Sequence, residues 1–104
     1  MTNKDPVLAR FREALDKAYG ARLERVVLFG SRARGDAKSE SDYDVAIFLH
    51  DLADRDAELD RLAPIQSRII DETEGVVHVL PFPAGAWADR APLMMMIRLE
   101  GLEL

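Results

Sequence analysis

The sequence predicts an α/β (α+β) fold in which helices pack on a small mixed β-sheet. Short apolar runs typical of buried strands alternate with longer stretches of helical periodicity. The first two predicted strands follow each other with only a short connection between them. A length of 104 residues, without internal repeats or a linker, suits one modest core. We therefore expect residues 1–104 to form a single domain.

The first predicted element is a helix that begins after Asp5. Asp5 suits the N-cap and Pro6 suits the first helical position, while Gly20 is a typical stop. Between them, apolar residues recur at helical spacing: Val7, Leu8, Phe11, Leu15 and Tyr19. The continuous apolar run at residues 26–29, just before Gly30, then predicts a strand buried on both faces.

Two further strands are predicted from runs of the same kind. Residues 45–49 are all apolar, and residues 76–80 are apolar apart from one histidine. Runs of this length, rich in β-branched residues, are typical of strands rather than helices. Pro81 and Pro83 are expected to close the later strand, because proline cannot donate to a sheet ladder.

Two further helices complete the predicted order of helix, strand, strand, helix, strand, helix. Residues 54–73 carry apolar residues at helical spacing, and Pro64 interrupts them. A proline inside a helix removes a hydrogen bond, so we expect a kink or two abutting helices at that point. Residues 91–100 predict the last helix.

Composition and charge exclude several classes of function. The formal net charge of −5 opposes direct nucleic-acid binding, which needs a basic face. No apolar run approaches the roughly 20 residues of a membrane span, and the start of the chain lacks the apolar region of a signal peptide. The chain has no cysteine, which excludes disulfides and zinc–thiolate sites. A cytoplasmic location is expected.

The Gly30-Ser31 pair at the end of the first strand indicates phosphate binding. Glycine lets backbone approach a ligand closely, and serine offers a hydroxyl and an N–H. If a helical turn opens at Ser31, its free N–H groups face any ligand above the strand end. A plain turn is the alternative interpretation of this pair.

Asp42 and Asp44 stand one residue apart at the start of the second strand. Alternate residues of a strand share a face, so the two carboxylates project side by side. Their mutual repulsion is relieved by a divalent cation, and Mg²⁺ favours one or two carboxylates together with phosphate oxygens. The alternative is a pair of solvated turn aspartates.

Together the two features resemble the signature of a known family. Gly30-Ser31, ten residues and then Asp42-Tyr43-Asp44 resemble the minimal nucleotidyltransferases (MNT) of the polymerase-beta-like superfamily. The intervening Gly-Ser-Arg-Ala-Arg-Gly-Asp-Ala and the closing residues 97–101 are also similar to this family. The resemblance covers nearly the whole chain. It implies the polymerase-beta-like fold and transfer of AMP from ATP to a hydroxyl acceptor with two metal ions.

The resemblance assigns roles to five residues of the Gly30–Asp44 stretch. It implies that Gly30 and Ser31 lie against the triphosphate, and that Arg32 adds a charge-assisted contact. It implies that Asp42 and Asp44 hold Mg²⁺. Arg34 lies in the same stretch, where it either reaches phosphate or is a solvated loop charge.

The chain departs from the family at the third carboxylate, whose strand position is taken by His78. A neutral imidazole can accept a proton from a hydroxyl and can ligate a metal, although Mg²⁺ prefers oxygen ligands. Three interpretations stay open. His78 works as a substitute, or it marks a site that has lost catalysis, or Glu74 or Glu72 supplies the carboxylate instead.

Stand-alone domains of this family commonly act as antitoxins that add AMP to a tyrosine of a small helical HEPN ribonuclease toxin. The resemblance therefore implies ATP and Mg²⁺ as cofactors and a HEPN-type toxin as partner in a hetero-oligomer. An acidic chain also suits a basic partner. The alternative is a catalytically impaired domain that neutralises its partner by contact alone, or that senses nucleotide without transferring it.

Overall fold

Four strands form one mixed sheet in the order β3-β2-β1-β4. The computed structural model describes residues 5–104. The strands are β1 (Leu23–Phe29), β2 (Tyr43–Leu49), β3 (Val77–Pro83) and β4 (Leu102–Glu103). β1 runs antiparallel to both β2 and β4, whereas β2 and β3 are parallel. The prediction of a small mixed sheet is confirmed.

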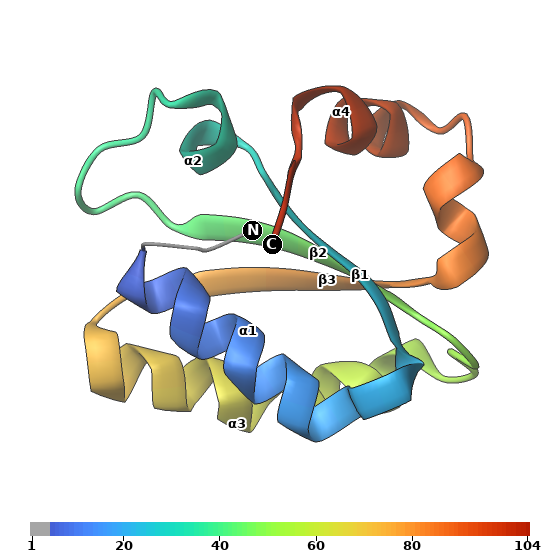
Figure 1. Ribbon diagram of the computed structural model, residues 1–104, viewed down its shortest axis with the longest axis horizontal. Helices are drawn as coiled ribbons and strands as arrows, with labels where there is room; N and C mark the ends of the chain where they lie inside the picture. Colours follow the sequence, from blue (N-terminus) through green and yellow to red (C-terminus); the bar gives the residue numbers. More distant parts are fainter. Residues whose placement is uncertain (1–4) are drawn as a thin grey trace.

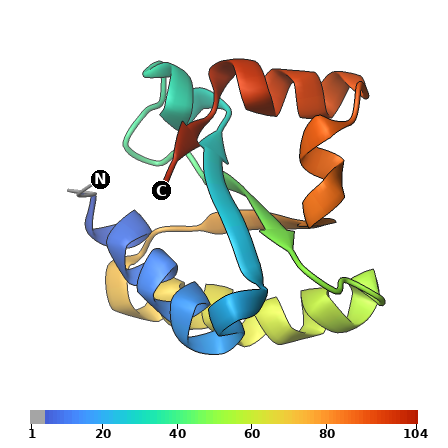
Figure 2. The same ribbon diagram turned by 45° about the vertical axis from the view of Figure 1, so that its right-hand side comes forward.

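Helices cover both faces of this sheet (Figure 1). On one face lie α1 (Pro6–Tyr19) and α3 (Arg55–Thr73), and on the other lie α2 (Ser31–Arg34) and α4 (Pro92–Glu100). The short helices η1 (Gly20–Arg22) and η2 (Ala84–Ala88) lead into β1 and out of β3. Figure 2 shows β4 returning from α4 to lie along β1. Within residues 5–104 no helix has the length and apolarity that a membrane span needs.

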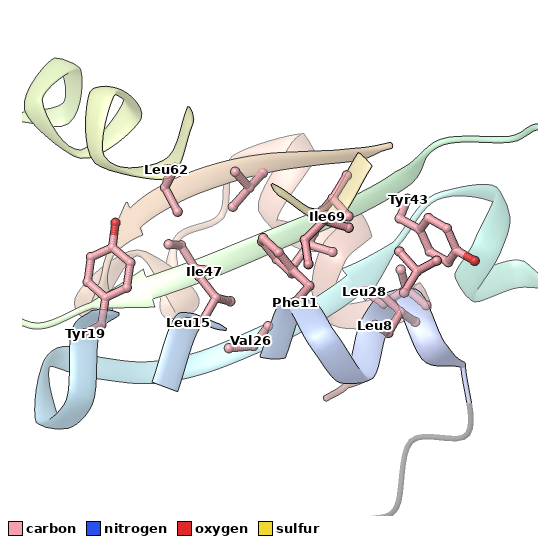
Figure 3. Close-up of a cluster of buried hydrophobic side chains, with 14 of the residues drawn as sticks. Leu8, Phe11, Leu15, Tyr19, Val26, Leu28, Tyr43, Ile47, Leu62 and Ile69 are labelled. Carbon is pink, nitrogen blue, oxygen red and sulfur yellow. The ribbon is translucent and has the colours of Figure 1, made fainter. Parts of the chain in front are cut away.

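The two faces of the sheet have separate apolar cores. Val45, Ile47 and Leu49 of β2 pack with α1 and α3, in the cluster drawn in Figure 3. Ala46 and Phe48, at the alternate positions, pack with Met94 and Ile97 of α4. Both sets of side chains in β2 are buried, as the continuous apolar run predicts.

Helix α1 begins and ends where the sequence predicts. The Asp5 side chain accepts hydrogen bonds from the N–H groups of Val7 and Leu8, at 2.8 and 3.4 Å. Pro6 is the first helical residue, and Gly20 ends the helix with a φ of 53°. The N-cap and the glycine stop therefore have the geometry that their residue types favour.

The expectation that Pro81 and Pro83 close the third strand was wrong for Pro81, which lies inside β3, and is confirmed for Pro83, where β3 ends. The Val76 carbonyl bonds to Tyr43 of β2, whereas the Val77 carbonyl accepts from the Gln66 side chain. Backbone polar groups point alternately toward and away from the neighbouring strand. The backbone nitrogens of both prolines, like the Val77 carbonyl, therefore point away from β2, toward the unpaired edge of the sheet. No ladder N–H is needed there, so proline is tolerated.

The alternative of two abutting helices at Pro64 was also wrong, because α3 is one helix from Arg55 to Thr73. Pro64 leaves the carbonyl four residues earlier, on Asp60, without its helical donor. Both residues are exposed, and water can satisfy that carbonyl.

Sequence reasoning missed β4, whose two residues are too few to show a period. Leu102 pairs with Leu28 and Glu103 pairs with Val27. Gly101 permits this return, because a Cβ there would lie 2.3 Å from the Ile97 carbonyl oxygen and 2.4 Å from Val27. Tertiary pairing, and not local propensity, therefore sets this strand.

Glu58 is buried under η1, the only buried charged side chain among residues 5–104. Its Oε1 lies 2.5 Å from Nη2 of Arg22. Burial is the largest single influence and favours the neutral acid, but Arg22, Tyr19 and Arg61 together outweigh it and lower the pKa of Glu58 below its ordinary 4.5. The ionised pair therefore stabilises the contact between α3 and η1.

We expect Glu58→Gln to lower the free energy of unfolding at pH 7 by about 1.5–3 kcal/mol, the range for a hydrogen bond to a charged group. Because the folded-state pKa lies below 4.5, the contribution is complete above pH 4.5 and is lost as the pH falls through that lower value. Urea unfolding across a pH series should show the two proteins converging in acid. A difference that stays constant with pH would contradict this assignment.

Candidate functional site

The turn after β1 lies directly beside the start of β2. The antiparallel register pairs Phe29, the last residue of β1, with Asp44. Gly30 follows, and α2 begins at Ser31, so the predicted phosphate turn and a predicted metal ligand meet at one edge of the sheet. Alternation along β2 places Asp44 on the face of Ala46, which packs with α4.

The parallel pairing of β2 with β3 brings His78 to the same edge. His78 is in register with Asp44, so the two side chains leave the same face. His78 Nε2 lies 3.1 Å from Asp42 Oδ2, and the two side chains are 61% and 45% exposed. Asp42, Asp44 and His78 therefore form one solvent-accessible group, which we call the Asp–His cluster.

Gly30 makes room for this cluster. Its φ of 75° and ψ of −156° lie in a region that only glycine readily adopts. A Cβ at this position would lie 2.6 Å from Asp44 Oδ2. The missing side chain therefore lets the backbone turn immediately against the Asp44 carboxylate.

Ser31 opens α2 next to Gly30. Within the described part of the chain, no side chain caps the start of this helix. The Ser31 carbonyl accepts hydrogen bonds from the N–H groups of Gly35 and Asp36, which closes the turn. Ser31 thus offers an amide and a hydroxyl in the turn that follows Gly30, and both are donors that suit phosphate oxygens.

The structure gives both predicted phosphate-binding arginines protein partners. The Arg32 guanidinium donates to the carbonyls of Ser39 and Ser41. Arg34 pairs with Asp36 at 3.2 Å and with Glu100 at 3.4 Å, and the hydrogen bond that Arg34 donates to the Asp36 carboxylate raises the Arg34 pKa. Contact of either arginine with phosphate stays a prediction.

Tyr43, between the two aspartates, points to the opposite face of the sheet. It is buried in the core beside α1, where Figure 3 shows its hydroxyl at the edge of the cluster. The hydroxyl donates to Asp5 Oδ2 at 2.8 Å, and burial, followed by that bond, raises the Tyr43 pKa. Sequence reasoning missed this contact, although strand alternation indicates an inward Tyr43, and a buried phenol usually needs a partner.

The donor set of the cluster fits a hard divalent cation. Asp42 and Asp44 offer two adjacent carboxylates, and Mg²⁺ commonly takes its remaining ligands from substrate phosphates and water. Among residues 5–104 no group of three or more histidines and acidic residues is arranged to hold a metal without such additions. The residues present therefore suit a metal that binds together with a phosphorylated ligand.

The structure does not favour Glu72 or Glu74 as the source of a third carboxylate. Glu72 lies within α3 and pairs with Arg10 of α1 at 3.3 Å. Glu74 ends α3 before β3 begins, and shares with Asp42 only the lining of a 420 Å³ cavity. Only His78 lies at the family position, in register with Asp44.

Sequence comparison agrees with this geometry. Residues 8–86 match the nucleotidyltransferase domain family. The chain belongs to this family. Two proteins of Methanocaldococcus jannaschii that carry the name protein adenylyltransferase are 42% identical over 45 residues and 39% identical over 46 residues. These stretches cover 43% and 44% of this nucleotidyltransferase-domain chain, but only 45% and 46% of the relatives' own lengths.

Solved structures share the nucleotidyltransferase fold. A toxin–antitoxin crystallised with AMP-PNP has a TM-score of 0.68 at 18% identity, covering 91% of this chain and 69% of that chain. A protein of Sulfolobus solfataricus described as a nucleotidyltransferase has a TM-score of 0.61 at 25% identity, covering 93% and 75%. A complex of a tri-AMPylated Shewanella oneidensis HEPN toxin with MNT antitoxin has a TM-score of 0.57 at 14% identity, covering 93% and 70%.

Proposed function

We propose that this nucleotidyltransferase-domain protein transfers AMP from ATP to a tyrosine hydroxyl of a HEPN-type toxin and thereby acts as its antitoxin. The observation that carries the proposal is the Asp–His cluster beside the Gly30 turn. Relatives named protein adenylyltransferase, and neighbours from toxin–antitoxin complexes, support this choice of reaction and partner.

In this reaction the phenolic oxygen forms a bond to the α-phosphorus of ATP, and the bond between the α-phosphorus and the bridging oxygen breaks. Pyrophosphate leaves with the electron pair, and the phenolic proton passes to a base. Asp42 and Asp44 would hold Mg²⁺, which when bound neutralises phosphate charge and lowers the pKa of the acceptor hydroxyl. Gly30 and Ser31 would face the phosphates. His78, 3.1 Å from Asp42, would accept the proton through its free ring nitrogen.

Two labels in parallel reactions test the reaction type. The chain, Mg²⁺ and a small helical protein of the HEPN toxin class are incubated with ATP labelled at the α-phosphate or at the γ-phosphate. We expect α-label to enter the helical protein and γ-label to stay in solution. Incorporation of γ-label would indicate phosphoryl transfer, and incorporation of neither would contradict the enzymatic proposal.

His78→Ala is expected to slow AMP transfer by about 100-fold, at the lower end of the range for removing a general base. His50→Ala is the matched control, because His50 lies just beyond the opposite end of β2, 2.6 Å from Glu24. Initial rates at saturating ATP measure the difference. Equal rates for His78→Ala and wild type would remove His78 from the catalytic step.

A second candidate function rests on the two-carboxylate donor set. In it, the domain neutralises its partner by contact alone and the cluster is a remnant. Neutralisation of toxin growth inhibition that survives the double variant Asp42→Asn/Asp44→Asn would favour this alternative. Loss of neutralisation in that variant, with complex formation retained, would favour catalysis.

A further inference from the structure

A clasp of three residues connects the loop between α2 and β2 to the body of the domain. We propose that Arg32, Tyr43 and Asp5, which we call the Arg32 clasp, position Asp42 for metal binding. The inference rests on the proposed function, because it assigns a purpose to residues behind the same site. In it, Arg32 is a positioning residue and not a phosphate ligand.

Arg32 forms hydrogen bonds with the backbone of the loop. Its Nε and Nη2 donate to the Ser41 carbonyl at 3.1 and 2.7 Å, and Nη2 also donates to the Ser39 carbonyl at 3.2 Å. Ser41 immediately precedes Asp42, so the guanidinium holds the peptide group that joins these two residues. The backbone of a metal ligand is thereby fixed by a planar fork of donors.

The loop has few other anchors. Among the described residues, the remaining hydrogen bonds of the segment 37–41 stay within it. Lys38 and Ser41 bond to each other through both backbone and side chain, and Ser39 bonds to Glu40. These contacts shape the segment without attaching it to the sheet. Arg32 therefore provides its hydrogen-bonded attachment to the rest of the domain.

The ring of Tyr43 forms a platform beneath the Arg32 guanidinium. Arg32 Cζ lies 4.2 Å from the centre of the Tyr43 ring, within the range of a cation–π contact. The ring is 6% exposed, so it offers a rigid surface. Tyr43 stands between Asp42 and Asp44 in the sequence, so a fixed Tyr43 ring restrains the backbone that carries both carboxylates.

A hydrogen bond connects this Tyr43 platform to the start of α1. The Tyr43 hydroxyl donates to Asp5 Oδ2 at 2.8 Å, while Oδ1 of Asp5 accepts from Val7 at the start of α1. The N-cap of the first helix thus also restrains the strand that carries the metal ligands. A connected chain of contacts runs from α1 through Tyr43 and Arg32 to the residue before Asp42.

Three variants test the clasp: Arg32→Ala, Arg32→Lys and Tyr43→Phe. Lysine retains a charge for phosphate but loses the fork, and phenylalanine retains the ring but loses the bond to Asp5. Arg68→Ala, on the exposed surface of α3, is the control for loss of an arginine. Hydrogen exchange of the amides of residues 38–42 is measured without ligand, and ATP affinity is measured by calorimetry with and without Mg²⁺.

We expect Arg32→Ala and Arg32→Lys to accelerate exchange of the loop amides by about 10-fold, the effect of losing one or two net hydrogen bonds. We expect Tyr43→Phe to act in the same direction with a smaller effect. The Mg²⁺-dependent gain in ATP affinity should fall by a similar factor, while affinity without Mg²⁺ stays at the wild-type value.

The opposite pattern overturns the clasp. Arg32 would be a phosphate ligand if three results occur together. Arg32→Ala would weaken ATP binding equally with and without Mg²⁺, Arg32→Lys would restore that binding, and hydrogen exchange of the loop amides would stay unchanged. The exchange measurement needs no nucleotide, so it decides the structural claim separately from the proposed function. If hydrogen exchange of the loop amides is unchanged in Arg32→Ala and the wild-type chain transfers AMP, the Arg32 clasp is wrong and the proposed function stands. If exchange is faster in Arg32→Ala but the wild-type chain transfers no AMP, the proposed function is wrong and the clasp stands.

Discussion

Asp44→Asn is expected to reduce AMP transfer by at least about 1000-fold, which corresponds to roughly 4 kcal/mol of transition-state stabilisation. Asparagine has the size of aspartate but lacks the charge with which Asp44 would bind a metal. Asp44 is also in register with both Phe29 and His78, so it lies at the centre of the site. Transfer rates and calorimetric titration with Mg²⁺ and ATP measure the two effects.

The stability of the same variant should not fall. Removing one of two neighbouring negative charges relieves repulsion in the absence of metal, so the unfolding midpoint should stay level or rise slightly. Asp71→Asn, on the exposed surface of α3, makes the same change of charge and should leave transfer unaltered. Full transfer activity in Asp44→Asn would exclude Asp44 as a metal ligand.

Gly30→Ala is expected to damage both folding and metal binding. A side chain at the φ and ψ of Gly30 costs about 1–3 kcal/mol of backbone strain. The new Cβ, 2.6 Å from Asp44 Oδ2, must also displace that carboxylate. Thermal unfolding should show a midpoint lower by roughly 4–8 °C for each kcal/mol lost. Mg²⁺-dependent ATP binding should be lost as well.

Gly35→Ala separates these two causes. Gly35 also has a positive φ, 87°, but a Cβ there meets no atom within 4 Å. It should therefore cost about 1 kcal/mol of stability through strain and retain transfer. If Gly30→Ala and Gly35→Ala lose stability and nucleotide binding to the same extent, close packing of Gly30 against Asp44 is not what the site requires.

The order of the main elements could be predicted because each carries a local signal. The cap at Asp5 marks the start of α1, and the apolar run at residues 45–49 marks β2. The errors occur where tertiary context decides. β3 retains its two prolines because they face an unpaired edge, and β4 exists only because Gly101 brings the chain against β1.

For the site, the spacing of Gly30, Asp42 and Asp44 was enough to predict which residues meet, since strand pairing brings them to one edge. The position of His78 on the third strand could be predicted from strand order. Its distance of 3.1 Å from Asp42 could not be predicted. The contacts of Arg32 could not be predicted either. A guanidinium beside a glycine turn suits phosphate and backbone carbonyls equally well by residue type.

Intact-mass spectrometry of a HEPN-type partner, after incubation with the chain, ATP and Mg²⁺, is the decisive test of AMP transfer. We expect the partner to gain the mass of at least one AMP, and fragmentation to place this AMP on a tyrosine. We expect no gain in mass when the chain carries Asp42→Asn/Asp44→Asn. A partner that binds the wild-type chain in a stable complex and keeps its unmodified mass would contradict the assignment of this site to AMP transfer.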